Sequence, residues 1–231
     1  MDVHFILTEP SHPGNVGSAA RAIKAMGFKS LRLVNPCDHF SKESKKLAYG
    51  AHDILHAATV FPSLSEAISD IDFTIATTAK KRTLWHDYFT PEACVDLIRS
   101  KGTVFETIGI VFGREESGLL TEEMALCDLR SLIPIANPYP SINLAQSVMI
   151  YAHIFSVYSI PQKNDVPLSV DLNEQRILKS KAMLLLEEIE VTKNPNLYRR
   201  MTERLMQINE DDTHLFLSFH RYLKRKLKNI P

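Results

Sequence analysis

Three segments rich in glycine, asparagine and serine carry residue types that bind anions and small molecules. The first follows an apolar run and reads PGNVGSAARA at residues 13–22. Its glycines, Gly14 and Gly17, permit tight backbone turns, and a helix that starts there offers free N–H groups to an anion. Their spacing fits neither the dinucleotide fingerprint nor the ATP-binding loop. Taken alone, the pattern favours a plain helix start, with Asn15 as N-cap and Arg21 on the surface.

The second segment joins an apolar run to a polar loop and reads IVFGREESGL at residues 110–119. In open α/β sheets, ligands bind beyond the carboxyl ends of the strands. Gly113 stands where such a strand would end, and a residue without a side chain lets the backbone approach a ligand closely. An ordinary strand-to-helix turn with solvated acids is the alternative.

The third segment, IPIANPYPSINLA at residues 133–145, contains three prolines and two asparagines ahead of a helical pattern. Proline has no N–H group to donate to a strand ladder. The segment is therefore predicted to be a rigid loop whose backbone cannot form a regular ladder. Ser141 or Asn143 could act only as the cap of the following helix.

Strands and helices are predicted to alternate around these segments. Short, nearly continuous apolar runs indicate strands that are buried on both faces, as in a parallel sheet. Cap residues between the runs indicate helices. This order predicts an α/β layered domain. The runs are Val3–Leu7, Leu31–Val34, Phe73–Thr78, Ile108–Phe112 and Leu132–Ile135, and the helices are Val16–Met26, those that begin at Ser63, Thr90 and Thr121, and Asn143 to about Tyr158.

The pattern changes near residue 160. The sequence PQKNDVP at residues 161–167 is typical of a linker, and helical spacing without any strand pattern follows it. We therefore expect a first domain over 1–160 and a linker with a helical extension over 161–231. About 70 residues are marginal for an independent core, so the extension is expected to dock on the first domain or on a partner. Two apolar helix faces are expected there, one formed by Leu178, Ala182, Leu185, Leu186 and Ile189 and the other by Phe216, Phe219, Leu223 and Leu227.

Composition excludes several classes of protein. Lys and Arg number 27, as do Asp and Glu, so the net charge is zero and any nucleic-acid surface must be local. Three cysteines without CxxC spacing indicate neither a zinc site nor a disulfide framework, and they suit a reducing cytoplasm. No apolar run is long enough for a signal peptide or a membrane span. We expect a cytoplasmic protein without metal or membrane.

Taken together, the three segments resemble the SpoU family of RNA ribose 2′-O-methyltransferases, within the SPOUT superfamily. The strings GNVGSAARA, VFGREESGL and IPIANPYPSINLAQSV carry the resemblance, which covers about residues 3–160. These motifs are most similar to those of family members that modify position 32 in the anticodon loop of tRNA. The resemblance implies a SPOUT fold, in which a mainly parallel sheet is flanked by helices and the C-terminal part of the domain forms a trefoil knot. It also implies a homodimer in which each site is completed near the partner subunit.

The resemblance assigns roles to individual residues. Arg21 matches the family's catalytic arginine, and because arginine stays protonated we expect it to donate hydrogen bonds to the developing alkoxide or an adjacent phosphate. Asn15 would orient the RNA or Arg21, and Glu115 would hold Arg21 or an asparagine in place. Ser141 and Asn143 would help to close the site. S-adenosylmethionine would contact Thr77, Thr78, Ala79, Gly113, Ile133, Ile135, Ser141 and Ile142.

Two basic clusters could supply the local charge that RNA requires. One follows the predicted cofactor segment, and the other lies in the C-terminal tail opposite the apolar residues of its predicted helix. Phosphate contacts would make binding strongly dependent on salt, whereas a solvated helix face is an equal alternative for the tail. The first cluster is Lys80, Lys81 and Arg82, and the second is Arg221, Lys224, Arg225 and Lys228.

Four alternatives stay open. His12 precedes the first segment and could act as a base, but sequence proximity is weak evidence in a chain with nine histidines. The target could be another ribose in tRNA or in ribosomal RNA. The chain could be an RNA-binding SPOUT protein that has lost catalysis. A nucleotide-binding α/β module would instead bind ATP or NAD.

Overall fold

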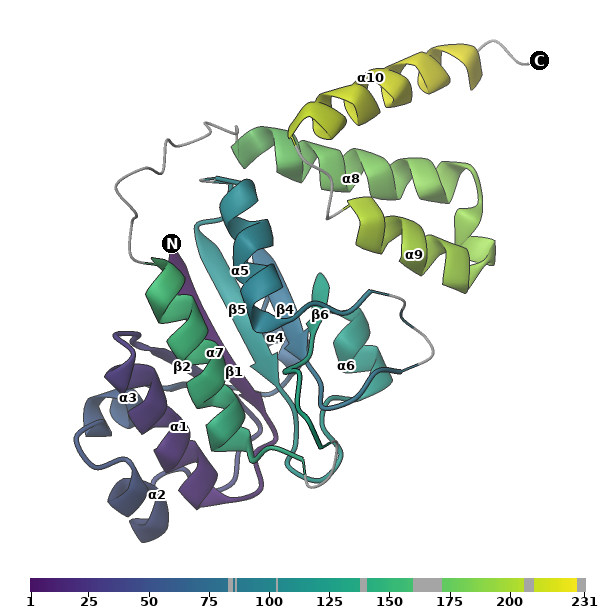
Figure 1. Cartoon of the computed structure of the whole chain (residues 1–231). Helices are drawn as coiled ribbons and strands as arrows, with labels where there is room; N and C mark the ends of the chain where they lie inside the picture. Colours follow the sequence, from purple (N-terminus) through teal and green to yellow (C-terminus); the bar gives the residue numbers. More distant parts are fainter. Residues whose placement is uncertain are drawn as a thin grey trace. The chain divides into compact units, whose positions relative to one another are not determined.

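A computed structural model describes residues 1–82, 85, 87–102, 104–137, 141–159, 172–205 and 210–227. Six strands form one sheet in the order β3-β2-β1-β5-β4-β6, and all pairs are parallel. Figure 1 shows this sheet with helices packed around it. The strands are β1 (Asp2–Thr8), β2 (Ser30–Val34), β3 (Thr59–Phe61), β4 (Phe73–Thr77), β5 (Thr107–Phe112) and β6 (Leu129–Ser131). The helices are α1 (Pro13–Ala25), α2 (Lys42–Leu47), α3 (His52–Ala57), α4 (Leu64–Ala67), α5 (Pro91–Ser100), α6 (Thr121–Ala125), α7 (Leu144–Ser159), α8 (Leu172–Glu188), α9 (Pro195–Leu205) and α10 (Glu210–Leu227), with a 3₁₀ turn η1 at Val191–Lys193.

The core lies on both sides of the central strands. β1 and β5 pair directly, with Phe5 opposite Ile110 and Leu7 opposite Phe112. These four side chains are buried, and the aromatic rings of Phe5 and Phe112 stack with their centroids 6.4 Å apart. Burial on both faces explains why the strand sequences are almost continuously apolar. The predicted α/β class with a parallel sheet is confirmed, while the trefoil knot stays a prediction from the resemblance.

Two strand predictions need correction. The run Leu132–Ile135 is not a strand, because β6 ends at Ser131 and the following residues pair with no neighbour in the sheet. Pro134 lies in this run and has no N–H group for a ladder. Conversely, β3 is an edge strand that the apolar pattern missed, since its Val60 is half exposed.

Helix α1 packs against α2 at very short range. A Cβ atom on Gly17 would lie 2.1 Å from the carbonyl oxygen of Ser44, so only glycine allows this approach. On another side α1 lies beside α7, and Figure 1 shows the two helices together in front of the sheet. The N-cap of α1 is His12, followed by Pro13 at the first helical position, so Asn15 is not the cap.

Two of the other predicted helix N-caps are confirmed and one is wrong. Ser63 caps α4 by accepting a hydrogen bond from the backbone of Glu66, and Thr90 likewise caps α5, as predicted. In α6 the N-cap is Leu120 instead of Thr121. The carboxylate of Glu123, in the first turn of α6, accepts a hydrogen bond from the Leu120 N–H at 2.7 Å. The start of the helix is therefore capped by this acidic side chain.

The chain divides into two compact units. One comprises Met1–Arg82, Tyr88–Asp96 and Glu106–Asp165, and the other comprises Thr83–Asp87, Leu97–Phe105 and Val166–Pro231. The expected boundary near residue 160 lies outside the described residues and stays a prediction. In the second unit, Ala182, Leu185 and Leu186 of α8 are buried as expected, but Ile189 and Phe219 are exposed. None of the helices that the structure describes is long and apolar enough to cross a membrane.

Candidate active site

One cavity of about 900 Å³ lies beyond the carboxyl ends of β1, β4, β5 and β6 in the first unit. This is the edge at which open parallel sheets bind ligands, and the volume lies within the ~300–1,000 Å³ typical of ligand sites. All three sequence segments contribute to its lining. The first segment enters from α1, the second follows β5, and the third follows β6 and leads into α7.

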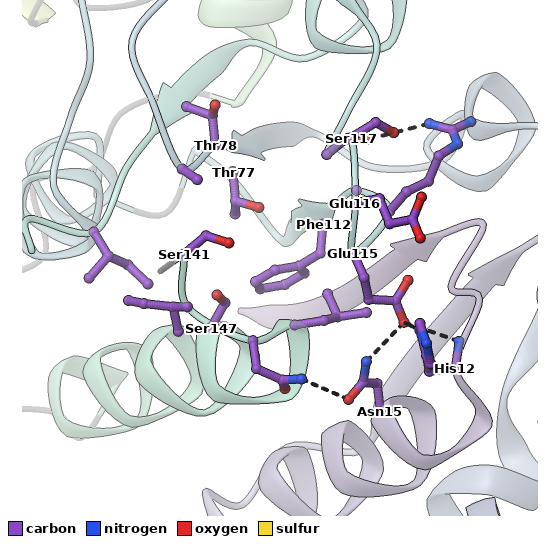
Figure 2. A pocket seen from close by; sticks show the side chains of 18 of the residues that line it. His12, Asn15, Thr77, Thr78, Phe112, Glu115, Glu116, Ser117, Ser141 and Ser147 are labelled. Carbon is purple, nitrogen blue, oxygen red and sulfur yellow. Dashed lines mark hydrogen bonds and ion pairs between the residues drawn. The ribbon is translucent and has the colours of Figure 1, made fainter. Parts of the chain in front are cut away.

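One side of the cavity is a network of side chains that we call the polar wall, formed by His12, Asn15, Glu115 and Asn143. Asn15 donates from Nδ2 to Glu115 Oε1 at 2.9 Å. Asn143 in turn donates from Nδ2 to Asn15 Oδ1 at 3.0 Å, and its own Oδ1 caps α7 by accepting the Ala145 N–H. Figure 2 shows this chain of contacts running from Glu115 through Asn15. Asn143 therefore caps a helix and also takes part in the site.

Glu115 is the centre of this network. Besides Asn15, its carboxylate accepts hydrogen bonds from the backbone N–H groups of Ser11 and His12 and from the Ser11 hydroxyl, at 3.0 to 3.2 Å. Burial by itself raises the pKa of a carboxyl, but the hydrogen bonds from Ser11 and Asn15 outweigh it and lower the pKa of Glu115 to about 2. The polar wall thus carries a permanent negative charge at neutral pH.

The loop that carries Glu115 is held by Arg114. Its guanidinium donates to Glu9 at 2.9 Å and, from both terminal nitrogens, to the two carboxylate oxygens of Glu123 at 2.9 Å. These hydrogen bonds raise the pKa of Arg114 above its ordinary value. A bidentate pair of this kind fixes orientation as well as charge. Arg114 is therefore a structural clamp between β1, the loop and α6.

Gly113 is required by the same loop. A Cβ atom there would lie 2.1 Å from both the Gly118 carbonyl carbon and the Leu119 nitrogen. Arg114 and Gly118 exchange backbone hydrogen bonds, which closes the turn. The steric reason for glycine is thus the chain's own loop, and not only the approach of a ligand that the sequence suggested.

The opposite side of the cavity contains small hydroxyl and apolar residues, and we call it the binding wall. Thr78 is fixed by its backbone N–H, which donates to Ser131 at the end of β6, and by its hydroxyl, which donates to the Lys80 carbonyl. Figure 2 shows Thr77, Thr78 and Ser141 on this side, away from Glu115. All eight residues predicted to contact the cofactor line the cavity, and we group them under the name binding wall: Thr77, Thr78, Ala79, Gly113, Ile133, Ile135, Ser141 and Ile142.

The basic cluster after β4 divides into two parts. Lys80 and Lys81 are exposed, and Lys80 lines the cavity. Arg82 instead donates hydrogen bonds to the Leu119 carbonyl and, at 3.4 Å, to the Thr121 hydroxyl. Its guanidinium therefore supports the loop between β5 and α6. In the tail cluster Arg221 is exposed, whereas the side chains of Lys224 and Arg225 and all of Lys228 lie outside the described residues.

Comparison with known proteins decides the family. Residues 2–153 match the model of the SpoU rRNA methylase family, which is more than half of the chain. The chain belongs to this family. Over 231 residues it is 38% identical to the uncharacterized tRNA/rRNA methyltransferase LasT of Escherichia coli (strain K12), covering 100% of this chain and 99% of LasT. The sequence-based recognition of the SpoU family is confirmed.

Relatives with a more specific name are also similar. The tRNA (cytidine-2′-O-)-methyltransferase TrmJ of Methanocaldococcus jannaschii is 35% identical over 190 residues, which is 80% of this chain and 79% of TrmJ. The crystal structure of TrmJ from Z. mobilis ZM4 superposes with a TM-score of 0.65 at 28% identity, covering 97% of this chain and 100% of that one. The SpoU methyltransferase AviRb from Streptomyces viridochromogenes, solved with AdoMet, has the same fold, with a TM-score of 0.53 at 20% identity over 68% of this chain and 60% of AviRb.

Arg21 is the one predicted catalytic residue that does not line the cavity of this SpoU chain. It lies on α1, is exposed, and has no hydrogen bond or ion pair with the described residues. Asn15, Glu115, Ser141 and Asn143 all line the cavity. The catalytic role of Arg21 stays a prediction.

Sequence reasoning missed the contribution of α2 to the cavity. Glu43 and Leu47 line it, and they reach it because Gly17 lets α2 approach α1. No local sequence motif predicts that α2 lines the cavity, since its position depends on the packing of two helix backbones. Among the described residues, no group of His, Cys, Asp and Glu side chains is arranged to hold a metal ion.

Proposed function

We propose that the protein transfers a methyl group from S-adenosylmethionine to the 2′-hydroxyl of a ribose in tRNA, at position 32 of the anticodon loop. The observation that carries this is the single cavity onto which all eight predicted cofactor residues and four of the five predicted catalytic residues converge. The names of the relatives support the chemistry, because TrmJ of M. jannaschii is a tRNA cytidine 2′-O-methyltransferase. The resemblance described above supports the position.

The cavity suits S-adenosylmethionine in size and in chemistry. Its apolar side chains, including Ile133, Ile135 and Ile142, would pack against an adenine ring, while Thr77 and Ser141 offer hydroxyls to the ribose and amino-acid parts. The carboxylates of Glu43 and Glu116 line the same space and would balance positive charge. When bound there, the cofactor supplies an activated methyl group on a sulfonium sulfur.

The polar wall would orient the ribose that accepts the methyl group. Asn15 is held between Glu115 and Asn143, so its amide cannot rotate freely and presents one fixed donor and acceptor pattern. Correct alignment of the oxygen with the methyl carbon supplies much of the rate enhancement in such a transfer. Arg21 would donate to the developing alkoxide or a neighbouring phosphate. Because Arg21 lies outside the cavity of one chain, this role fits the expected homodimer, in which each site is completed near the partner.

Local positive charge would bind the RNA. Lys80 lines the cavity and Lys81 follows it in the chain, and both are exposed, so phosphates there would meet two ammonium groups. Arg221 is exposed on α10 and would contact phosphates as well. This local charge accounts for RNA binding by a chain of zero net charge.

The test is methylation of unmodified tRNA with labelled S-adenosylmethionine, followed by nuclease digestion and mass spectrometry. We expect a 2′-O-methyl group at position 32, and a fall of about 10²–10³-fold in the rate for Arg21→Ala. Lys24→Ala is the matched control, because Lys24 lies one turn further along α1 in an exposed pair with Asp53. Label at another tRNA ribose, or on ribosomal RNA alone, would refute position 32 and keep the reaction. An unlabelled RNA would refute the reaction, and full activity of Arg21→Ala would refute the role of Arg21.

A further inference from the structure

The proposed reaction requires a group that accepts the proton of the ribose 2′-hydroxyl. A ribose hydroxyl is a weak nucleophile while it is neutral, so its proton must leave during the transfer. Arg21 cannot accept it, because arginine stays protonated in proteins. Glu115 is a poor acceptor as well, since hydrogen bonds keep the pKa of its carboxyl at about 2. An imidazole is suited to this task near neutral pH, and His12 lines the cavity.

The position of His12 is set by the backbone on both sides. It is the N-cap of α1 in an extended conformation, and Pro13 follows it at the first helical position. Its own N–H is bound to Glu115. The ring remains accessible, with 63% of the side chain exposed, while the Glu115 side chain beside it is only 12% exposed. Figure 2 shows the ring of His12 next to the carboxylate of Glu115.

Hydrogen bonding selects one tautomer of this ring. Ser11 has a single hydroxyl proton and donates it to Glu115 Oε2 at 3.0 Å. The Ser11 Oγ lies 2.9 Å from His12 Nδ1. Because the ionised carboxylate takes the Ser11 proton, we assign the proton of this second contact to Nδ1. Nδ1 is also 3.4 Å from Glu115 Oε1. With the proton on Nδ1, the neutral ring keeps a lone pair on Nε2, which has no hydrogen bond to the described residues.

We propose that His12, supported by Glu115, is the general base that removes the proton from the ribose 2′-hydroxyl. This rests on the proposed function. As the 2′-oxygen bonds to the methyl carbon, its O–H bond breaks and the proton passes to His12 Nε2. The electron pair of the broken carbon–sulfur bond stays on sulfur, and the charge on the ring is balanced by Glu115. The products are the methyl ether, the neutral thioether and an imidazolium that releases its proton to solvent.

The surroundings of the ring favour a transient positive charge. Glu115 and Glu116 face the cavity from the loop after β5, and Glu43 faces it from α2. The cations that line the same space are Lys80 and Arg82 after β4, and Arg114, which is neutralised by Glu9 and Glu123. The carboxylate of Glu115 is thus in direct contact with the ring, with Nδ1 and Oε1 3.4 Å apart.

The experiment compares wild type, His12→Gln, His12→Ala and the control His56→Ala, whose ring is exposed on α3 away from the cavity lining. Single-turnover methylation of tRNA is measured from pH 5.5 to 9. We expect the wild-type rate to fall on the acid side as an imidazole protonates. His12→Gln should lose about 10²–10⁴-fold and lack this titration, and added imidazole should partly restore His12→Ala. Calorimetry should find unchanged affinity for S-adenosylmethionine, and His56→Ala should behave as wild type.

A second readout does not depend on activity. Nitrogen-15 NMR of the ring should find neutral His12 protonated on Nδ1 in wild type, with that preference lost in Glu115→Gln. A fully active His12→Gln would overturn the proposal, and so would a uniform loss of rate that keeps the wild-type pH profile or a ring protonated on Nε2. Wild-type protein that methylates no RNA would overturn the proposed function together with this inference, so the two failures are distinguishable.

Discussion

The two walls of the cavity are built in different ways. The polar wall is a continuous network in which Glu115, Asn15 and Asn143 hold one another through side chains, and it joins residues from three distant parts of the chain. The binding wall contains small hydroxyl residues and isoleucines, and among them Thr78 is held by its backbone N–H, which donates to the Ser131 carbonyl. A network of charged and polar groups can orient atoms and move protons, whereas a backbone-positioned surface offers shape. We infer that the two walls divide reaction from cofactor binding.

The largest effect is expected from a change that deforms both walls. Gly113→Ala would place its new methyl group 2.1 Å from the backbone of Gly118 and Leu119, and backbone cannot move aside as a side chain can. We expect a loss of about 1–3 kcal/mol in unfolding free energy, as for overpacking, with loss of both cofactor binding and methyl transfer. Urea unfolding and calorimetry measure these. Ser117→Ala, exposed in the same loop, is the control, and a stable, active Gly113→Ala would contradict the loop geometry.

The second change separates the walls by acting on reaction alone. Asn15→Ala removes a donor to the ionised Glu115 and the acceptor for Asn143. A hydrogen bond to a charged group contributes ~1.5–3 kcal/mol, which corresponds to about 10- to 100-fold in rate. We expect that loss in single-turnover rate, with unchanged affinity for S-adenosylmethionine. If Asn15→Ala weakened cofactor binding instead, the division between the walls would be wrong.

The third change is the converse. Ile133→Ala shortens an apolar side chain of the binding wall without touching the polar network. Loss of ~1–2 kcal/mol of apolar contact should weaken cofactor binding by about 10-fold. The rate at saturating cofactor should stay within a factor of a few of wild type. Calorimetric titration measures the affinity for the cofactor, and a saturation curve measures the rate. A fall in the saturated rate as large as that of Asn15→Ala would contradict the division of roles between the two walls.

The smallest effect concerns acid stability. Hydrogen bonds lower the pKa of Glu115 from 4.5 to about 2, so the folded state binds a proton less readily than the unfolded chain. The stability that this carboxylate contributes is therefore fully present above about pH 5 and is lost as the pH falls toward 2. We expect the difference between the urea curves of wild type and Glu115→Gln to be largest at pH 6 and clearly smaller at pH 3, because the contribution disappears only as the pH approaches 2. Equal separation at both pH values would show that the negative charge contributes nothing.

The sequence predicted some strands and site residues correctly and others not. The apolar runs correctly predicted β1, β2, β4 and β5, because strands buried on both faces need apolar side chains throughout. The prediction of a strand at Leu132–Ile135 was wrong, since Ile133 and Ile135 line the cavity and do not belong to the sheet. The resemblance named eight residues that line the cavity. Glu43 and Leu47 could not be predicted, because a distant glycine brings their helix into place.

The sequence by itself determined the SpoU family, the parallel sheet and the three segments that meet in the cavity. Local residue types suffice for these, because burial patterns and glycine positions act over a few neighbours. Only the tertiary structure decided that Asn15 is no helix cap and that Glu115 binds His12 and Asn15, across 103 and 100 residues of sequence. It alone showed that Arg21 lies outside the cavity. Hydrogen bonds between segments so far apart exist only after the sheet has brought the strand ends together.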